Sequence, residues 1–202
     1  MNTAKDLFII AMDVGQKHSV GQGDLSLALA GAELVDLIEA EAVTLDADRV
    51  VPAPRRTLED RLLGEAASAL SEEVPFEQVD DWLWRRGRDL SAAYQTAFED
   101  AGELLRRGTR GRLNLGADRL ELADTPSRHR ALRRWEDEEP VLVSLAEAVG
   151  IPNGASEPEG TLDGEALTTV VAAVNDAVME LEAVRQRRSI ESAAFANVWR
   201  GP

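Results

Sequence analysis

Residues 104–122 read LLRRGTRGRLNLGADRLEL, and they hold the clearest hairpin pattern in a chain that elsewhere has helical spacing. Two alternating runs, residues 112–115 and 119–122, flank Gly116-Ala117-Asp118, a three-residue sequence typical of hairpin turns. Alternation places the leucines of both runs on one face: Leu113, Leu115, Leu120 and Leu122. An isolated two-stranded ribbon is only marginally stable in water. We therefore expect these leucines to pack on the domain's own helices, on a second subunit or on lipid.

The segments around this hairpin have the spacing and the end signals of helices. The preceding helix is expected to begin with Ser91 as its cap and to end in Arg106 and Arg107, with Gly108 as the stop. Asp24 and Thr57 are the expected N-caps of two earlier helices. The predicted helices are residues 5–13, 24–40, 57–73, 75–86, 91–107, a helix from residue 126, residues 140–149, and residues 163–188 with an extension to 199.

Together these patterns predict a mainly α fold, a single-domain multi-helix bundle over residues 1–202 with a projecting β-hairpin. Residues 43–45 and 49–51 surround Asp46-Ala47-Asp48 and predict a small strand pair. Residues 150–161 are rich in Gly and Pro and are expected to form a flexible internal loop. If the last helix ends at residue 188, residues 189–202 are expected to be a frayed tail.

Composition excludes several classes of protein. The 202 residues contain no cysteine, which excludes disulfides, thiolate metal sites and a cysteine nucleophile. No apolar run approaches the roughly 18 residues of a membrane span, and residues 1–13 lack the pattern of a signal peptide. We therefore expect a cytoplasmic protein that meets a membrane, if at all, peripherally, on the inner face of the plasma membrane.

The charge of the chain is divided unevenly. The formal net charge is -15. This argues against general nucleic-acid binding, because affinity for nucleic acid comes mainly from basic residues that neutralise its phosphates. Between Trp82 and Arg134, however, 12 Arg face 7 Asp and Glu, a net of +5, and the rest of the chain carries -20. A basic region on an acidic body can orient a protein toward an anionic surface.

Seven arginines near the hairpin form the candidate lipid or anion site: Arg85, Arg86, Arg88, Arg106, Arg107, Arg110 and Arg112. The alternative is that they are solvated helix ends whose charges complement helix dipoles. Trp82 and Trp84 are two residues apart and cannot share a helix face, so we expect Trp82 in the core and Trp84 in an exposed contact. The hairpin itself lacks the aromatic residues that favour a membrane interface, which favours subunit pairing.

Other motifs give no catalytic, metal or cofactor site. His18 and His129 have neither metal-ligand nor general-base spacing. Gly21-Gln22-Gly23 precedes a helix as a phosphate loop does, but Asp24 would place a negative charge where the anion should bind. An acidic cluster is expected on the solvated side of the second helix; it comprises Glu33, Asp36, Glu39 and Glu41. We therefore predict a protein that is not an enzyme and that needs no cofactor.

Four segments, taken in order, resemble one known family. They are DLFIIAMD from residue 6, ALAGAELVDLIEAEAVTL from residue 28, VDDWLWRRG from residue 79, and ELLRRGTRGRL from residue 103, followed by the hairpin and RHRALRRW. The chain resembles a compact bacterial member of the Golgi phosphoprotein 3 family, of the type found in actinobacteria. The resemblance covers residues 6–184, with gaps before Ser91 and around residues 150–160.

This resemblance implies a fold with a four-helix core and a projecting hairpin. It also implies peripheral membrane association, because eukaryotic members bind the head group of phosphatidylinositol 4-phosphate and the tails of glycosyltransferases. The family's head-group pocket uses one Trp and three Arg, and the corresponding positions here are Gly21, Ala30, Tyr94 and Ala97. None of the four residue types is retained, which argues against specific phosphoinositide binding through that pocket.

Two functions follow as hypotheses. The first is a non-enzymatic peripheral protein that binds an anionic membrane lipid head group, or a membrane-protein tail, through the arginine-rich region. The second is a soluble adaptor that has lost lipid binding and forms a homo-oligomer through the hairpin.

Overall fold

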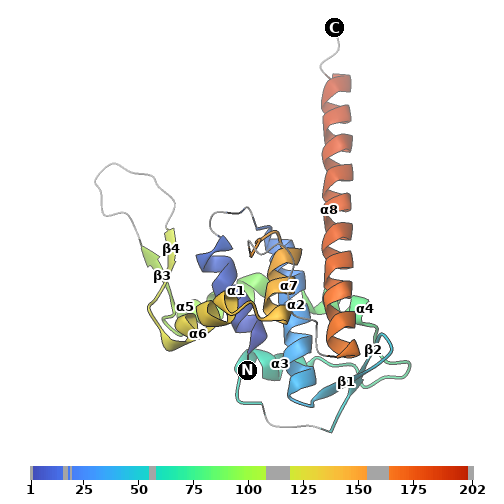
Figure 1. Ribbon diagram of the computed structural model, residues 1–202. Coiled ribbons are helices and arrows are strands. Elements are labelled where there is room, and N and C mark those ends of the chain that lie inside the picture. Colours follow the sequence, from blue (N-terminus) through green and yellow to red (C-terminus); the bar gives the residue numbers. More distant parts are fainter. Residues whose placement is uncertain are drawn as a thin grey trace.

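The computed structural model describes residues 2–15, 18, 20–54, 58–107, 119–153 and 164–199, with the backbone alone at residues 107, 119 and 193–199. The fold is mainly helical with two antiparallel strand pairs, as the sequence predicts (Figure 1). The helices are α1 (Thr3–Asp13), α2 (Gln22–Glu39), α3 (Arg61–Ser68), α4 (Val79–Arg86), α5 (Leu90–Asp100), α6 (Pro126–Glu136), α7 (Pro140–Ala148) and α8 (Glu165–Trp199). The strands are β1 (Val43–Asp46), β2 (Arg49–Pro52), β3 (Leu104–Arg107) and β4 (Arg119–Leu122).

Helix α2 is the centre of the molecule. It contacts α1, α3, α4, α5, α7 and α8, and every residue from 25 to 37 is buried. A helix that is apolar nearly all round is stable only when other elements cover all of its sides. Gly31 permits the closest of these contacts, because a Cβ added there would lie 2.3 Å from Cγ2 of Val174 in α8. The small residues of α2 therefore set how closely α8 packs.

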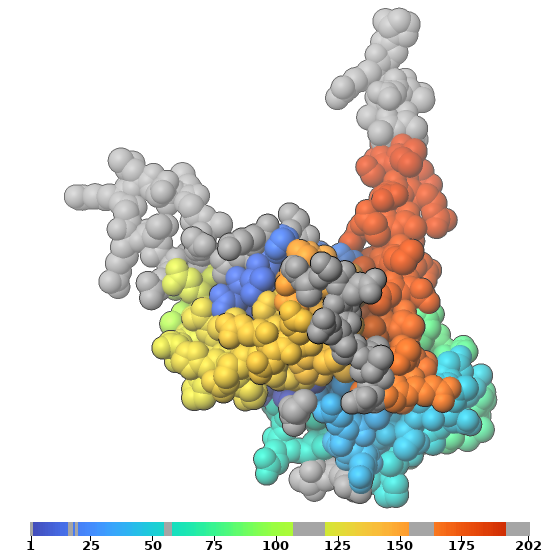
Figure 2. Space-filling view, in the orientation of Figure 1, coloured from blue at the N-terminus to red at the C-terminus, as the bar shows by residue number. Residues whose placement is uncertain are grey.

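Helix α8 has a packed half and a projecting half. Val170, Val174 and Ala177 are buried against the body, and the helix then continues upward beyond the other elements (Figure 1). In the space-filling view its red portion stands clear of the domain (Figure 2). The helix reaches Trp199, the longer of the two end points that the sequence pattern indicates, so residues 189–199 are helical.

The hairpin differs from the predicted one. Helix α5 ends at Asp100, not at Arg107, because Gly102 takes a φ of +69° and the amide of Glu103 donates to the carbonyl of Phe98. Residues 104–107 are thereby released to form β3, which pairs with β4 in the register Leu104↔Leu122 and Arg107↔Arg119. The predicted first strand at residues 112–115, its turn and Gly108 lie outside the described residues.

Four predicted helix starts are also wrong. Helix α2 is preceded by Gly21 as N-cap, so Asp24 lies inside its first turn. Helix α3 begins after Asp60, whose side chain accepts a hydrogen bond from the amide of Leu63. The expected cap Thr57 lies outside the described residues. Helix α4 begins at residue 79, well after Pro75, and Ser91 is the second residue of α5 and not its cap. The helix from residue 126 and the helix from residue 140 begin where Pro at the first position predicts.

The acidic cluster of α2 is not a solvated face, contrary to the prediction. Glu33 and Asp36 are 0% and 2% exposed, whereas Glu39 and Glu41 are exposed as expected. Asp36 accepts hydrogen bonds from the amides of Thr3 (2.7 Å) and Ala4 (3.0 Å) at the start of α1. Burial of a carboxylate costs a large free energy unless hydrogen bonds or an opposite charge compensate it. These two acids therefore hold neighbouring helices to α2.

The small strand pair is confirmed, with Val43 opposite Pro52 and Asp46 opposite Arg49. The start of the predicted loop 150–161 is packed rather than free. Gly150 has a φ of +83° and Ile151 is fully buried. Residues 154–161 lie outside the described residues.

Candidate functional site

The arginines predicted as an anion site do not form one cluster. Arg85 binds Glu77, with its Nη2 2.6 Å from Oε2, and lies 5.2 Å from the ring centroid of Trp82. Arg106 binds Glu99 in α5 at 3.1 Å. Each guanidinium therefore has its own carboxylate partner, one just before α4 and one in α5. The side chain of Arg107 is not described, and Arg110 and Arg112 lie outside the described residues.

Arg86 has a structural role at the centre of the fold. Its Nε and Nη2 lie 2.7 and 2.9 Å from the two carboxylate oxygens of Glu33, and the hydroxyl of Tyr94 donates to the same carboxylate at 3.2 Å. Burial raises the pKa of Glu33, and the hydrogen bonds and charge of Arg86 oppose that rise. Burial also raises the pKa of Tyr94, and the charge of Glu33 adds to that effect. This group joins α2, α4 and α5 and is closed to a ligand.

Arg88 is different. Of the candidate arginines whose side chains the structure describes, it alone has no ion-pair partner among the described residues, and it is exposed. It follows Gly87, the residue that ends α4. A Cβ on Gly87 would lie 2.5 Å from the carbonyl oxygen of Leu83 and 3.2 Å from that of Ser26. Glycine therefore lets the end of α4 rest on α2, which places Arg88 beside the beginning of α2.

A groove of about 520 Å³ opens beside Arg88. Its sides come from the start of α2, the junction of α4 with α5, and α8; the lining includes Ser26, Trp84, Arg88, Ser91 and Leu181. We call this the α2–α5–α8 groove. Trp84 is half-buried there, where the sequence predicts an exposed contact, while Trp82 is in the core as predicted.

Two contacts fix the shape of this groove. The hydroxyl of Ser26 donates to Oγ of Ser91 at 2.9 Å, which joins α2 to α5. Arg185 of α8 donates to both oxygens of Asp24 at 2.8 and 2.7 Å, which joins α8 to α2. The hydrogen bonds to Asp24 raise the pKa of Arg185. Asp24 is thus neutralised by a partner, so that Arg88 and the exposed Asp89 are the charged groups that line the groove.

The four positions carried over from the family's pocket do not meet at one open site. Gly21 lies at the N-cap of α2, beside Arg185 and near the groove. Ala30 is fully buried and its carbonyl accepts from Nε1 of Trp82 at 3.1 Å. Tyr94 is 1% exposed, and Ala97 lines a separate hollow with Lys5 and Asp60. Ala30 and Tyr94 therefore cannot contact a head group in this fold.

The hairpin leucines pack partly on the domain itself. Leu104 is buried, and Leu120 and Leu122 are half-buried against the core, on the face that Leu104 shares. Leu105 points to the other face and is 44% exposed. Leu113 and Leu115 lie outside the described residues, so their expected role in an interface stays a prediction.

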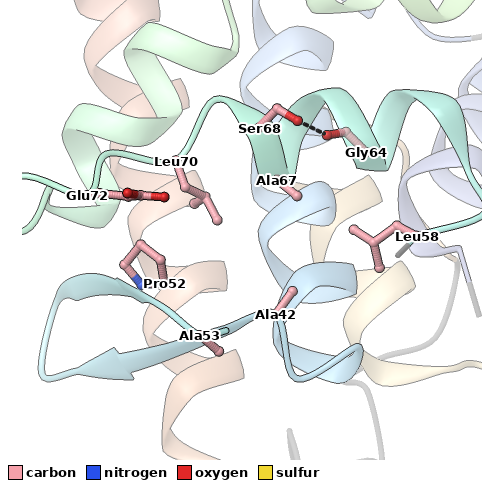
Figure 3. A pocket seen from close by; sticks show the side chains of 9 residues that line it. All are labelled: Ala42, Pro52, Ala53, Leu58, Gly64, Ala67, Ser68, Leu70 and Glu72. Carbon is pink, nitrogen blue, oxygen red and sulfur yellow. Dashed lines mark hydrogen bonds between the residues drawn. The ribbon is translucent and has the colours of Figure 1, made fainter. Parts of the chain in front are cut away.

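A third hollow lies between the β1–β2 pair and α3 (Figure 3). Its volume is about 130 Å³, and small side chains such as Ala42, Ala53 and Ala67 line it. Ser68, the hydroxyl-bearing residue there, donates to the carbonyl of Gly64 at 2.8 Å (Figure 3). This hollow offers a ligand little beyond apolar contact and the carboxylate of Glu72.

Within the described ranges, no group of His, Asp and Glu side chains is arranged to hold a metal ion. Among the helices that the structure describes, none combines the length and the apolar character needed to cross a membrane.

Comparison with protein families gives a match over most of the chain. Residues 4–188 fit the family model described as Golgi phosphoprotein 3 (GPP34). A comparison with curated protein sequences finds no match. Among the described elements, the matched range runs from the second residue of α1 to Arg188 in α8, and residues 189–199 of α8 lie beyond it.

Proposed function

The chain belongs to the Golgi phosphoprotein 3 family, and from this premise we propose that it is a non-enzymatic peripheral membrane protein that binds an anionic lipid head group in the α2–α5–α8 groove. The observation that carries the proposal is Arg88, an exposed guanidinium without an ion-pair partner among the described residues, on the wall of an open groove. We place the protein on the inner face of the plasma membrane.

The chemistry of the groove suits a phosphate-bearing head group. A guanidinium binds phosphate through two parallel hydrogen bonds, each worth about 1.5 to 3 kcal/mol when the acceptor is charged. The indole of Trp84 offers an apolar wall beside it, and the hydroxyls of Ser26 and Ser91 lie in the same lining. The family's head-group pocket has three arginines, whereas this groove has one, Arg88. We therefore propose that the groove binds anionic head groups in general and does not select phosphatidylinositol 4-phosphate.

The test is flotation of the 202-residue chain with vesicles of phosphatidylcholine, alone or with phosphatidylglycerol or phosphatidylinositol 4-phosphate. Wild type should float with both kinds of anionic vesicle and not with phosphatidylcholine alone. Arg88→Ser should weaken flotation about 10- to 100-fold, the equivalent of one charge-assisted contact. The control is Arg61→Ser, which removes one equal charge from α3, where Arg61 already binds Glu65.

Equal flotation of the Arg88→Ser and Arg61→Ser variants would contradict a head-group site in the groove. Absence of flotation with every vesicle would favour the second hypothesis, the soluble adaptor. Light scattering across a concentration series would then show whether the chain forms a homo-oligomer.

A further inference from the structure

Helix α8 has an apolar stripe on the face that points away from the domain. Four large apolar side chains are exposed in the described part of the chain, and two of them, Met179 (70%) and Ile190 (69%), lie on α8. They are 11 residues apart, so at 3.6 residues per turn they lie within about 20° of each other around the helix. Ala172 and Ala183 are also exposed and lie within about 40° of Met179. We call these four residues the outer stripe of α8.

The domain does not cover the outer stripe. Helix α8 packs on the body through Val170, Val174 and Ala177, which are buried and lie about 140° to 180° from Met179 around the helix. Beyond them residues 186–192 are exposed, and the red portion of α8 stands clear of the domain in Figure 2. An apolar stripe that a fold leaves in water along a helix is typical of an interaction surface. The outer stripe is therefore expected to have an external partner.

A second copy of α8 fits this stripe when the two helices are antiparallel. Exposed positions on the outer face alternate in spacings of four and three residues, as helices that pack along each other require. They are Ala172, Asp176, Met179, Ala183, Gln186 and Ile190. A two-fold axis between positions 184 and 185 places Met179 of each copy opposite Ile190 of the other. The same axis places Ala183 opposite Gln186, a small side chain opposite a long one, so that the face is complementary to itself.

The charges beside the stripe match across the same axis. Glu180 and Arg187 are exposed, lie on one edge of the outer stripe, and have no ion-pair partner among the described residues. In an antiparallel symmetric pair each edge meets the same edge of the other helix, running in the opposite direction. Glu180 of each copy therefore lies opposite Arg187 of the other. The pair gains two ion contacts that the single chain lacks.

Other partners fit this face less well. A parallel pair of helices would place Asp176 of both copies opposite each other in the contact, where the like charges repel. An anionic lipid surface would meet the same Asp176 and, at the two edges of the stripe, the exposed carboxylates of Glu180 and Glu182. The outer stripe is therefore better suited to a protein chain than to a membrane, and its self-complementarity favours a second copy.

Antiparallel pairing also gives the projecting part of α8 a contact. Residues 186–192 of one copy lie along the outer face of the packed half of the other. The two bodies do not collide, because each packs on the inner face of its own helix. Leu181, the α8 residue that lines the α2–α5–α8 groove, packs against the core on that inner face. The groove therefore stays open when the outer stripes meet.

We propose that this chain forms a two-fold symmetric dimer through the outer stripes of two antiparallel α8 helices, with Met179 against Ile190 and Glu180 paired with Arg187. The proposal goes beyond the head-group site and does not depend on it. It also differs from pairing through the hairpin, because β3 and β4 take no part in the contact. One pair of helices is a small interface, so the dimer is expected to exchange with the monomer.

The absence of cysteine permits a direct test of this register, because one introduced cysteine per chain reports on one position. The 202-residue chain is prepared as Met179→Cys and, with a tag that changes its mass, as Ile190→Cys. Under mild oxidation the mixture should give mainly the cross-link from position 179 to position 190. Cross-links between like positions should be rare, because the proposed pair separates them by about 16 Å along the helix, and a disulfide needs Cα atoms within about 7 Å.

The ion contacts are tested by charge reversal, with dimerisation followed by sedimentation velocity across a concentration series. Glu180→Arg and Arg187→Glu each replace two attractive contacts with two repulsive ones, which should weaken dimerisation about 8- to 30-fold. An equal mixture of the two variants should recover the affinity, because opposite charges again face each other at both contacts of a mixed dimer. The control is Arg188→Glu, the same change at an exposed position on the other side of α8, which should leave dimerisation unchanged.

Several results would overturn the proposal. They are a chain that stays monomeric at every concentration, a predominance of like cross-links, which indicates parallel helices, and a statistical mixture of all cross-links. Loss of association in Leu105→Ser, where the native side chain is 44% exposed, without loss in Glu180→Arg would assign the contact to the hairpin. Recovery in the mixture cannot come from misfolded variants. Because none of these assays contains lipid, their failure and the failure of flotation are separate results.

Discussion

Replacing Arg86 by Met should destabilise the fold more than any substitution of an exposed arginine. In the native protein the side chain of Arg86 is 16% exposed, and its guanidinium donates to both carboxylate oxygens of Glu33, whose side chain is 0% exposed. Methionine fills much of the same volume but leaves the carboxylate of Glu33 buried with only the hydroxyl of Tyr94 as donor. Breaking a buried pair in this way costs about 3 to 5 kcal/mol, a large part of the roughly 5 to 15 kcal/mol that stabilises a domain.

The pH dependence of the lost unfolding free energy shows whether the unpaired carboxylate of Glu33 causes it. Burial raises the pKa of Glu33, and Arg86 opposes the rise, so the Arg86→Met variant should have a still higher pKa at Glu33. A carboxyl whose pKa is higher in the folded state stabilises the fold when protonated and loses that contribution as the pH rises. The difference in unfolding free energy between variant and wild type should therefore shrink as the pH falls from 8 to 5.

The assay is urea unfolding followed by far-UV circular dichroism. Arg61→Met makes the same chemical change at the exposed pair Arg61–Glu65, where the side chains are 63% and 49% exposed. That variant should lie within about 0.5 kcal/mol of wild type. The double variant Glu33→Met with Arg86→Met should recover most of the loss, because no buried charge remains. A loss at Arg86 no greater than that at Arg61 would refute the central role of the Glu33–Arg86 pair.

Two further predictions concern α2. Gly31→Ala should be less stable than Gly64→Ala by about 1 to 3 kcal/mol in urea unfolding. Both variants gain helix propensity, but the new methyl group at position 31 would lie 2.3 Å from Val174, whereas nothing lies within 4 Å of the one at position 64. Equal stabilities of the two variants would contradict tight packing of α2 on α8. Burial raises the pKa of Asp36 to about 7, so its contribution to stability should fall between about pH 4 and pH 7 by roughly 4 kcal/mol. In Asp36→Asn, the decrease of stability with rising pH, followed by thermal unfolding across that range, should be smaller than in wild type. An unchanged decrease would mean that other groups cause the pH dependence.

Local signals in the sequence predicted the helices that begin at proline. Thr125-Pro126 and Pro140 each place a proline at the first helical position, where its fixed φ and missing amide fit, and α6 and α7 begin there. The second strand of the hairpin, residues 119–122, is confirmed as β4. The end of α5, and with it the strand that pairs with β4, was predicted wrongly because two glycines fit a helix end. Gly108 follows two arginines and fits a helix end by pattern, but Gly102 is the residue that takes the left-handed conformation.

Burial of acids could not be predicted from the sequence. Glu33 and Asp36 are spaced as a polar stripe would be, and a stripe on a surface helix is solvated. Their partners are a guanidinium 53 residues away and two amides at the start of α1, 32 and 33 residues away. Nothing in the local pattern marks those partners. One feature of the sequence does indicate burial of these acids: small and aliphatic residues occupy all the remaining faces of α2.

The same long-range pairing explains why counting charges along the chain did not locate the candidate site. The segment from Trp82 to Arg134 is basic by count, but most of its arginines whose side chains are described bind acids of the same chain: Arg85 binds Glu77, Arg86 binds Glu33, Arg106 binds Glu99, Arg128 binds Asp13, and Arg130 and Arg134 bind Asp6. These charges are paired within the fold and are not available to an external anion. A membrane function in this fold must therefore depend on the few arginines that the acids leave unpaired. Among the described residues, Arg88 at the groove meets that condition, as do Arg133 of α6 and Arg187 and Arg188 of α8. The ion pairs are better tested as determinants of stability.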